Sequence, residues 1–489
     1  MLVSAVCYFR SDRYMNSLNY LMVMLRTRAL EPVYERDLFD GALNGMLETL
    51  DDNSSYFLPK SYKEFDEALR QEIGGIGAIF RIDETTQKPT ISFTLPDTPA
   101  RKAGLLPEDQ ILAVAGHPAE GLSVDRIREL LDGEVGTAVA VDIFRPASSA
   151  TSQTLHLSIQ RSRIRVETVE GFSRTPDGSW EYFLPAFFPA PAEDASGEMT
   201  AEKEAVGVPA PQTKIAYVKL TSFGEHTATE LKNTLLGLKK RGMAGLVLDL
   251  RDNTGGLLDA ANKVCDLFLD QGVIVSTRGR DGVELKTFMA SPSRILDKKT
   301  PIVVLINHLS ASASEIVAAC IQDHAREGEL NAVCVGTRTF GKGTVQELIA
   351  LGPLPNDHPI TGGSGDASEG NVSGIWDLWQ QLWKKTPRAA VRITVASYWR
   401  PSGKNIHRFT RGNKKADESE DWGVLPDPGM EVEFPRTARG SVQPAFQKTV
   451  DTFSRKRFHG ILTPTELEKA YDVDPQLKKG VEWLNTQSL

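Results

Sequence analysis

The sequence has few cysteines, and their positions exclude two kinds of site. Only four occur in 489 residues, and no two of them are spaced as C-x-x-C. Thiols this sparse and scattered form neither a disulfide framework nor a zinc site. They are Cys7, Cys265, Cys320 and Cys334. We expect three of them to be small residues of the core.

Positive charge is also scarce. The chain carries 56 Lys and Arg against 64 Asp and Glu, a formal net charge of −8, and it has no long Lys/Arg cluster. Nucleic acids and anionic membranes bind basic patches, so neither is an expected partner. With 40% hydrophobic and 25% charged residues, the composition is typical of a globular protein in water.

The amino terminus has no long apolar run. About eight apolar residues precede Arg10, whereas a membrane-spanning helix needs roughly 20. Two interpretations stay open: the tail of a clipped signal or anchor segment, or a first helix of the core. Neither a cationic leader nor a small-residue cleavage site is complete, so the residues alone leave the compartment open.

The length exceeds what one hydrophobic core supports, so two to four domains are expected. Residues 1–70 repeat apolar side chains at helical spacing and predict an N-terminal helical region. Residues 71–164 run strand, short helix, strand, helix, strand, which predicts a compact second domain. Residues 165–440 alternate apolar strands with helices, which is typical of an α/β core with a buried sheet. Residues 441–489 are predicted to form a helical C-terminal region.

Two stretches interrupt the core pattern. Residues 181–213 are rich in Pro, Ala and Glu, and residues 352–386 begin with a Gly- and Pro-rich run, so both are predicted insertions. The second contains IWDLWQQLWKK, which places Trp376, Trp379 and Trp383 on one helical face. Such a face must pack against another surface. Either this surface is within the core, or the helix is a lid that faces a substrate or a second subunit.

The segment LINHLSASASEIVAACIQDH, residues 305–324, has Ser310, Ser312 and Ser314 at alternate positions between an apolar run and a helical one. Free N–H groups at a helix start can hold an anion, and a serine there becomes a nucleophile once a base takes its proton. Serine also caps helices without any catalysis. The spacing alone does not choose between these functions.

The segment VGTRTFGKGTVQE places Lys342 between two glycines about thirty residues further on. A phosphate-loop interpretation fails at Gly343, where a Mg²⁺-binding hydroxyl should stand, and no clear helix follows. A lysine held neutral can be a general base, and an exposed turn lysine is the simpler alternative. Histidine is the usual base, but His324 lies about three helical turns beyond Ser312, and no acid is placed to orient His308.

A third segment, LDLRDNTGGLLDAA, runs from a predicted strand into Gly255 and Gly256 at the start of a helix. Such a turn can point backbone N–H groups at a ligand oxygen. It can equally be a tight connection between strand and helix.

Taken together and in this order, the motifs resemble those of the carboxyl-terminal processing proteases, tail-specific serine peptidases with an embedded PDZ domain. The resemblance covers nearly the whole chain. The motifs that carry it are LDDNSSYF, TPARKAGLLPEDQILAVAGH, VKLTSF, LVLDLRDNTGGLL, SASASEIVAA, VGTRTFGKGTVQ, VASYWRPSGKNI and GVLPDPGMEV. The implied fold is multidomain α/β, with an N-terminal helical module, a PDZ domain, a ClpP/crotonase-like α/β serine protease core and a short helical C-terminal region.

The resemblance also implies roles for particular residues. The catalytic residues would be Ser312 as nucleophile, Lys342 as general base and Gln346, which orients the lysine. The oxyanion hole would use backbone N–H groups of Ala313, Gly255 and Gly256. In the PDZ domain, the carboxylate of a substrate's tail would meet Gly75, Ile76 and Gly77. No metal or nucleotide enters this mechanism.

Partners and location follow from the same resemblance. Proteins with unstructured C-terminal tails are the expected substrates, and an extracytoplasmic location is expected. A membrane anchor upstream and a homo-oligomer are compatible with it. The usual Gly-Asp turn of the PDZ region reads Glu108-Asp109 here, and the two insertions are atypical, which bears on substrate range more than on chemistry. The alternative function is a PDZ scaffold that binds peptides without cutting them.

Overall fold

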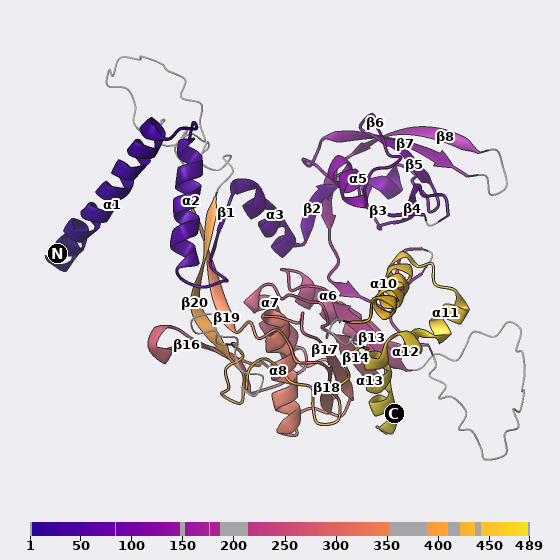
Figure 1. Ribbon diagram of the computed structural model, residues 1–489. Helices are drawn as coiled ribbons and strands as arrows, with labels where there is room; N and C mark the ends of the chain where they lie inside the picture. Colours follow the sequence, from indigo (N-terminus) through magenta and orange to yellow (C-terminus); the bar gives the residue numbers. More distant parts are fainter. Residues whose placement is uncertain are drawn as a thin grey trace, which may run out of the picture. The chain divides into compact units, whose positions relative to one another are not determined.

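The computed structural model describes residues 2–83, 85–146, 152–175, 177–185, 214–351, 389–408, 421–435 and 442–487. The chain divides into two compact units (Figure 1). One contains Met1–Asp66 and Thr344–Ala396, and the other contains Glu67–Gly343 and Ser397–Leu489. The second predicted insertion, with its three tryptophans, lies outside the described residues.

The first unit combines helices with part of a sheet. Its elements are α1 (Leu2–Arg28), α2 (Glu35–Glu48), β1 (Ser55–Phe57), β19 (Thr344–Ala350), the start of α3 (Pro59–Arg70) and most of β20 (Ala390–Trp399). Strand β20 pairs with β19 and, antiparallel, with β1. The predicted helical N-terminal region is confirmed. Among the helices that the structure describes, none has both the length and the apolar character to cross a membrane.

The second unit begins with an antiparallel sheet. Its strands follow the order β3-β4-β5-β7-β8, and β6 pairs with β5. Their bounds, with those of the two helices, are β3 (Ala78–Ile82), β4 (Pro89–Thr94), α4 (Pro99–Lys102), β5 (Gln110–Val114), β6 (His117–Pro118), α5 (Val124–Leu131), β7 (Ala138–Arg145) and β8 (Gln153–Gln160). In β7, Val139, Val141 and Ile143 are buried at alternate positions, as expected for a sheet with one face on a core. A two-stranded ribbon of β2 (Glu72–Gly75) and β9 (Ser162–Arg165) flanks this sheet in sequence.

The atypical turn before β5 is held by charged contacts. Glu108 adopts a φ of 69°, a conformation in which glycine is less strained. Its carboxylate pairs with Arg81 at 3.0 Å. The neighbouring Asp109 is 1% exposed and accepts two hydrogen bonds from Arg145, each at 2.7 Å. Ion pairs therefore fix this turn where the family pattern has glycine.

The core of the second unit is a mostly parallel sheet in the order β10-β13-β14-β17-β18. Its strands are β10 (Val169–Glu170), β13 (Ile215–Leu220), β14 (Gly245–Asp249), β17 (Ile302–Ile306) and β18 (Ala332–Gly336). Every residue of β14 and β17 is buried, because helices cover a parallel sheet on both faces. The helices that follow its strands are α6 (Thr227–Lys240), α7 (Leu258–Asp266) and α8 (Ala313–Arg326).

The C-terminal helices complete this core. They are α10 (Pro444–His459), α11 (Pro464–Glu468), α12 (Ala470–Val473) and α13 (Pro475–Thr486). Leu477 and Val481 of α13 lie in one apolar cluster with Val303 of β17 and Val335 of β18.

The remaining short elements are β15 (Val273–Arg278), η1 (Arg280–Gly282) and β16 (Glu284–Met289). Strand β15 pairs with residues 397–399 of β20.

The structure corrects the start of the first predicted insertion. Strand β12 (Trp180–Glu181) pairs with β11 (Ser173–Arg174), and Leu184 is fully buried. The Leu184 N–H donates to Ile215 O at 3.0 Å, so this stretch is bonded to the edge of the core sheet. Residues 181–185 belong to the core because Phe183 and Leu184 are buried apolar side chains, although the composition around them is that of an insertion. Residues 186–213 lie outside the described part of the chain.

Three cysteines are buried and unpaired, as predicted. They are Cys265, Cys320 and Cys334, and none of them forms a disulfide. They act as small apolar side chains of the core.

Candidate active site

The three motif-bearing loops follow three adjacent parallel strands. Residues 250–256 follow β14, residues 307–314 follow β17, and residues 337–342 follow β18. Since β14 pairs with β17 and β17 with β18, all in parallel, their carboxyl ends meet at one edge of the sheet. In open α/β sheets this edge is where ligands bind. The fold therefore brings together the segments that the sequence singled out.

Two of the three serines are committed to the backbone. Ser310 Oγ donates to Leu250 O at 2.8 Å, and Ser314 Oγ donates to Asn253 O at 2.7 Å. Ser312 differs from both, because no backbone carbonyl of the described residues accepts a hydrogen bond from its hydroxyl. Its φ of 57° and ψ of −113° are strained for a residue with a side chain. Strain of this kind gathers at functional sites.

Tyr398, on β20, contacts Ser312. The Ser312 side chain lies close enough to its phenol to affect the pKa of Tyr398. Burial raises the pKa of Tyr398 to about 12, and the Ser312 contact opposes this rise. The phenol therefore stays protonated at neutral pH and can donate to Ser312. Sequence reasoning missed this residue, since nothing in its motif links it to the serine segment.

One buried carboxylate joins the serine segment to the lysine loop. Glu315 Oε2 accepts the Ser312 N–H at 2.9 Å and the Lys342 N–H at 2.8 Å. Its Oε1 accepts the Gly341 N–H at 2.7 Å and the Thr339 hydroxyl at 2.6 Å. Because one oxygen accepts from both nitrogens, the distance between the backbone nitrogens of Ser312 and Lys342 cannot exceed the sum of those two hydrogen-bond lengths.

The charge of Glu315 is set by two opposing effects. The side chain is 0% exposed, and this burial raises the pKa of Glu315 to about 7, whereas its four donors lower it. All four neighbours donate, so the geometry suits a carboxylate that accepts on both oxygens. Sequence reasoning missed Glu315, although its S-x-x-E spacing from Ser312 is that of a capping box.

Packing explains the two glycines beside Lys342. A side-chain carbon on Gly341 would lie 2.7 Å from the Trp422 ring, and one on Gly343 would lie 2.2 Å from the His407 nitrogen. Both distances are too short for any side chain. The loop around Lys342 therefore packs closely against other segments of the same chain, and the lysine itself is half-buried.

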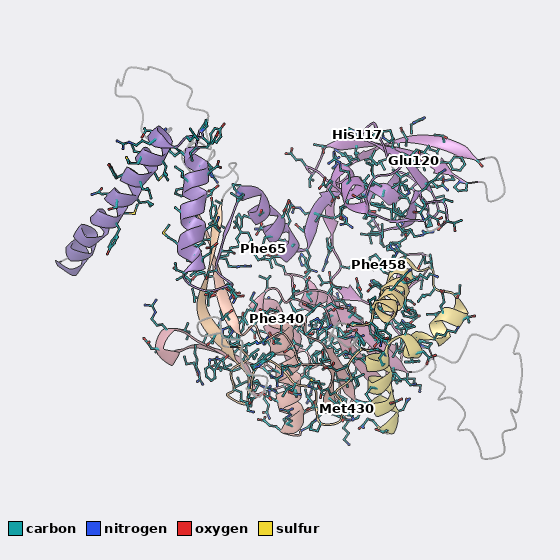
Figure 2. All side chains as sticks on the ribbon, viewed as in Figure 1. Phe65, His117, Glu120, Phe340, Met430 and Phe458 are labelled. Atoms are coloured by element: carbon teal, nitrogen blue, oxygen red, sulfur yellow. The ribbon has the colours of Figure 1, made fainter. Side chains whose placement is uncertain are left out.

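Apolar side chains reach the surface beside the same loops. Leu309 is 42% exposed. Phe340, which Figure 2 labels, is 53% exposed. The Phe340 N–H donates to Ser310 O at 2.9 Å, which joins the two loops directly. Exposed apolar groups here can contact apolar side chains of a ligand.

His324 is not placed as a base for Ser312. His324 is 3% exposed, and its Nε2 is bonded to Val273 O at 2.8 Å. His308 is exposed to solvent. The strand β19, rather than a helix, follows the lysine loop, which also excludes a phosphate loop. In the described ranges, no group of three or more His, Cys, Asp or Glu is arranged to hold a metal ion.

The glycine turn is shaped by close contacts. Gly255 and Gly256 have φ values of 107° and 145°. A side-chain carbon on Gly255 would lie 2.9 Å from Ser312 Cβ, and one on Gly256 would lie 2.2 Å from Phe223 O. Neither position can accept a side chain, and Gly255 lies directly against Ser312.

The N–H groups at this turn are not equivalent. Gly255 N–H donates to Asn253 Oδ1 at 2.9 Å, so it is already bonded. Within the part of the chain that the structure describes, no group accepts a hydrogen bond from the Gly256 N–H or the Ala313 N–H. The geometry thus favours Gly256 over Gly255 as the donor of the turn, together with Ala313.

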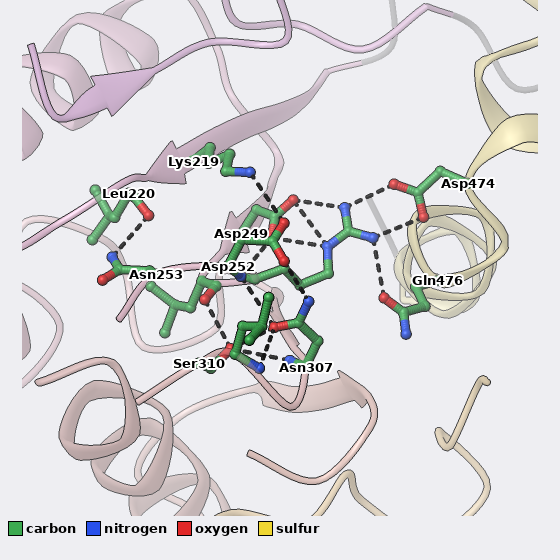
Figure 3. Close-up of polar contacts among 12 residues, drawn as sticks. Lys219, Leu220, Asp249, Asp252, Asn253, Asn307, Ser310, Asp474 and Gln476 are labelled. Atoms are coloured by element: carbon green, nitrogen blue, oxygen red, sulfur yellow. Dashed lines mark hydrogen bonds and ion pairs between the residues drawn. The ribbon is translucent and has the colours of Figure 1, made fainter. Parts of the chain in front are cut away.

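A buried ion-pair network lies beside these loops (Figure 3). Arg251, two residues after β14 ends, donates to Asp249 at 2.6 Å, to Asp474 at 2.7 Å and to Gln476 at 3.1 Å. Burial alone would raise the pKa of Asp249, but the Arg251 guanidinium holds it well below its usual range. The network fixes the start of α13 to the loop that carries Gly255.

Gln346 lies on β19 in the first unit. Its Nε2 donates to Thr344 Oγ1 at 2.7 Å and to Thr394 Oγ1 at 3.3 Å. Its role toward Lys342 stays a prediction.

A groove in the second unit is lined by the predicted tail-binding residues Gly75, Ile76 and Gly77. Its volume is about 620 Å³, and its lining also includes β3 together with Val124, Arg128 and Leu131 of α5. A side-chain carbon on Gly77, at φ 76°, would lie 2.4 Å from Thr98 Cβ, so the loop requires glycine there. A strand added beside β3 would run along this groove. Contact with a substrate's tail stays a prediction.

Comparison with known proteins adds independent findings. Residues 214–411 match Peptidase family S41, and residues 95–145 match the PDZ domain. The chain is 30% identical over 422 residues to a carboxy-terminal-processing protease of Bartonella bacilliformis, covering 85% of this chain and 75% of that one. It is 32% identical over 337 residues to the carboxy-terminal processing protease CtpA of Bacillus subtilis, covering 68% and 61%. A solved structure of a photosystem II D1 C-terminal processing protease is 25% identical, with a TM-score of 0.38, and the match covers 86% of this chain and 89% of that one.

Proposed function

Because the chain belongs to peptidase family S41, among the carboxy-terminal processing serine proteases with a PDZ domain, we propose that it cuts proteins near their C-termini with a Ser312-Lys342 dyad. Gln346 is the proposed orienting residue for the lysine. The alternative function, a PDZ scaffold without catalysis, would not require a strained serine beside a lysine loop.

One observation carries this proposal. The same Glu315 oxygen binds the backbone N–H groups of Ser312 and Lys342, at 2.9 and 2.8 Å. The two residues come from loops after different strands, and a shared buried acceptor gives them a fixed relative position. A scaffold that only binds peptides has no need of such a link.

The chemistry follows from these positions. Lys342, as the neutral amine, takes the Ser312 Oγ proton while Oγ attacks the carbonyl carbon of a peptide bond. The Gly256 and Ala313 N–H groups hold the oxyanion, and losing one such donor typically costs about 2.7 to 4 kcal/mol of transition-state stabilisation. The lysine ammonium then gives its proton to the leaving amine, which leaves an acyl-enzyme. Water attacks that ester, with Lys342 again taking a proton, and frees the enzyme.

Substrate selection is the proposed task of the PDZ domain. Backbone N–H groups near Gly77 would hold the carboxylate of an unstructured tail, and the tail would add as a strand beside β3. Val124 and Leu131 offer apolar contacts on the opposite side of the groove. An extracytoplasmic location, an upstream membrane anchor and a homo-oligomer stay predictions of the family resemblance.

The test is hydrolysis of an unstructured reporter protein by purified wild-type, Ser312→Ala and Lys342→Ala chains. Both variants should lose measurable turnover while keeping the wild-type circular dichroism spectrum and melting temperature. The wild-type rate should rise toward alkaline pH with a single ionisation, because the base is an amine; a histidine base would titrate near about 6.5. Cleavage near the wild-type rate by either variant would show that the dyad is wrong.

A further inference from the structure

Asn253 is bonded to three segments that meet beside Ser312, and Figure 3 shows its bond to Leu220. It is 0% exposed, and its Nδ2 donates to Leu220 O at 2.8 Å. Its Oδ1 accepts the Gly255 N–H at 2.9 Å. Its main-chain oxygen accepts the Ala311 N–H at 3.0 Å and the Ser314 hydroxyl at 2.7 Å. One residue thus joins the end of β13, the glycine turn and the serine segment.

These bonds fix the direction of the Gly256 N–H. In a trans peptide the C=O and the N–H point in opposite directions, and the described chain has no cis peptide bond. The Gly255 C=O is held by the Phe223 N–H at 3.0 Å, so the Gly256 N–H on the same peptide points the other way. Asn253 holds the preceding peptide through the Gly255 N–H. Both peptides of the turn are therefore anchored.

The Ala313 N–H is fixed in the same manner. The Ser312 C=O accepts the Ile316 N–H at 3.0 Å within α8, which sets the orientation of the Ser312-Ala313 peptide. Asn253 holds the residues on either side of this peptide, through Ala311 and Ser314. The two N–H groups without an acceptor therefore lie on segments that Asn253 binds at once.

We propose that Asn253 is a positioning residue that sets the distance between the two oxyanion donors, the Gly256 N–H and the Ala313 N–H. This rests on the proposed serine protease function. An asparagine that bonds only to the backbone two residues ahead is a common turn device. Asn253 differs because its side chain also ties the turn to Leu220 O, at the end of β13, while its main-chain oxygen holds the serine segment. Loss of the side chain therefore releases the glycine turn from β13 and changes the position of the Gly256 N–H relative to the Ala313 N–H.

The chemistry of the side chain explains why this residue is asparagine. The site needs one acceptor toward Gly255 and one donor toward Leu220, and a side-chain amide supplies both. Alanine supplies neither. A carboxylic acid supplies both when it is protonated, but when it is ionised it has no donor for the Leu220 carbonyl.

The first experiment compares steady-state kinetics of wild-type, Asn253→Ala and Asn262→Ala chains on one peptide substrate. Asn262 is a matched control: it is 7% exposed, lies on α7, and its side-chain nitrogen and oxygen have no hydrogen-bond partner among the described residues. We expect Asn253→Ala to lower kcat by about 10²-fold or more, the effect of a misplaced oxyanion donor, with KM within about threefold. The Asn262→Ala variant should keep both values within about threefold.

A second readout separates positioning from general destabilisation. A peptide aldehyde forms a tetrahedral adduct with a serine nucleophile, whereas the same peptide ending in an alcohol does not. The Ki of the aldehyde should weaken in Asn253→Ala by about the same factor as kcat, and the Ki of the alcohol should stay within about threefold. A variant that only melts at a lower temperature would change neither the Ki of the aldehyde nor the Ki of the alcohol relative to wild type.

The isosteric variant Asn253→Asp guards against a failure to fold. Its kcat relative to wild type should be highest at acidic pH, where the new carboxyl is protonated and can donate to Leu220 O, and should fall as pH rises. A wild-type kcat in Asn253→Ala, an equal loss in Asn262→Ala, or a pH-independent ratio for Asn253→Asp would overturn the proposal. Absence of hydrolysis by the wild-type chain would instead overturn the proposed function itself.

Discussion

The polar groups around Ser312 are buried and bonded to one another, whereas those that line the groove beside Gly77 range from buried to exposed. Ser310, Asn253 and Glu315 are each 0% exposed and each has at least two hydrogen-bond contacts. In the groove, most residues of β3 are half-buried and the Arg128 side chain is 59% exposed. The two regions belong to the same unit but are built differently.

This difference matches the two tasks that we propose for these regions, catalysis and the binding of tails. A reaction site needs donors and acceptors held within a fraction of an ångström, and buried hydrogen bonds supply that rigidity. A groove for tails of varied sequence needs shape and charge that tolerate several side chains. Changes around Ser312 should therefore act on kcat, and changes in the groove should act on KM.

Apart from changes to Ser312 and Lys342 themselves, the largest expected effect is that of Glu315→Ala on kcat. The variant leaves the N–H groups of Ser312, Gly341 and Lys342 without their buried acceptor, and each unsatisfied donor costs about 1 to 3 kcal/mol. We expect kcat to fall by about 10²-fold or more, with KM changed by less than about threefold, measured on a peptide substrate well below the melting temperature.

Asp323 provides the matched control on the same helix. It is also a buried carboxylate, 4% exposed, and it pairs with Arg400 rather than with the catalytic loops. Asp323→Asn should lower the free energy of unfolding by about 3 kcal/mol, because it leaves a buried guanidinium unpaired, but should keep kcat within about threefold. Equal losses of kcat in both variants would mean that Glu315 acts only through stability.

Tail chemistry should change KM next most strongly. A disordered reporter ending in Ala-Ala should be cut with a KM about tenfold lower than one ending in Asp-Asp, because extra negative charge near the loop adds repulsion and desolvation cost. An amidated end should also raise KM. Gly77→Ala, which forces a side chain against Thr98, should remove these differences while kcat stays near wild type. Equal KM values for all three tails in the wild-type chain would leave the groove without a role in selection.

Asp132 should give a smaller, pH-dependent effect. A side-chain carbon on Gly75 would lie 2.9 Å from its Oδ1, so the carboxyl lies beside the predicted tail-binding loop. Burial raises the pKa of Asp132 to about 6, Arg128 and Arg161 lower it, and Glu67 raises it. The KM for a free tail should therefore rise by about threefold as pH increases through 6, and Asp132→Asn should abolish this dependence.

The same shift predicts a change in stability. Because folding raises the pKa of this acid, the folded state binds its proton more tightly than the unfolded state does. The free energy of unfolding therefore falls as pH rises from about 4 to 6. Allowing for solvent near this half-buried group, Asp132→Asn should raise the free energy of unfolding by about 1 kcal/mol at pH 8 and by nothing at pH 3.5. Urea denaturation at the two pH values measures the difference, and identical gains at both would contradict it.

The smallest expected effect on catalysis is that of Ser310→Ala and Ser314→Ala. Each removes a hydrogen bond to a backbone carbonyl, worth about 1 kcal/mol, and Ser310→Ala also removes the bond from the Asn307 N–H. Neither changes Ser312, the proposed nucleophile. Both variants should retain at least about one-tenth of wild-type kcat. A loss as complete as that of Ser312→Ala would show that the distinction among the three serines is wrong.

Much of the fold was predictable because it follows from local pattern. Apolar strands followed by helices predicted the core sheet, and the motif loops lie at its edge because neighbouring parallel strands end there. Glu315 was within reach of the sequence, since its spacing from Ser312 is that of a capping box. The burial of Phe183 and Leu184 was missed because the composition around these two side chains is that of an insertion.

Other features depend on contacts between distant parts of the chain. Tyr398 reaches Ser312, and Leu220 accepts a bond from Asn253, only after the sheet has assembled. The pairing of Glu108 with Arg81 likewise joins residues 27 apart in the sequence. Spacing within one segment carries no signal for such pairs. Likewise, only the bond between Gly255 and Asn253 shows that the N–H groups of Gly255 and Gly256 differ as possible donors to an oxyanion.

The central claim, that Ser312 is the nucleophile activated by Lys342, is tested most directly by covalent labelling. The wild-type chain is treated with a fluorophosphonate at several pH values, and the modified peptide is mapped by mass spectrometry. We predict a single modified residue, Ser312, with a labelling rate that rises toward alkaline pH, no label in Ser312→Ala, and labelling at least about 10²-fold slower in Lys342→Ala. Label on Ser310 or Ser314, or an undiminished labelling rate in Lys342→Ala, would contradict the account.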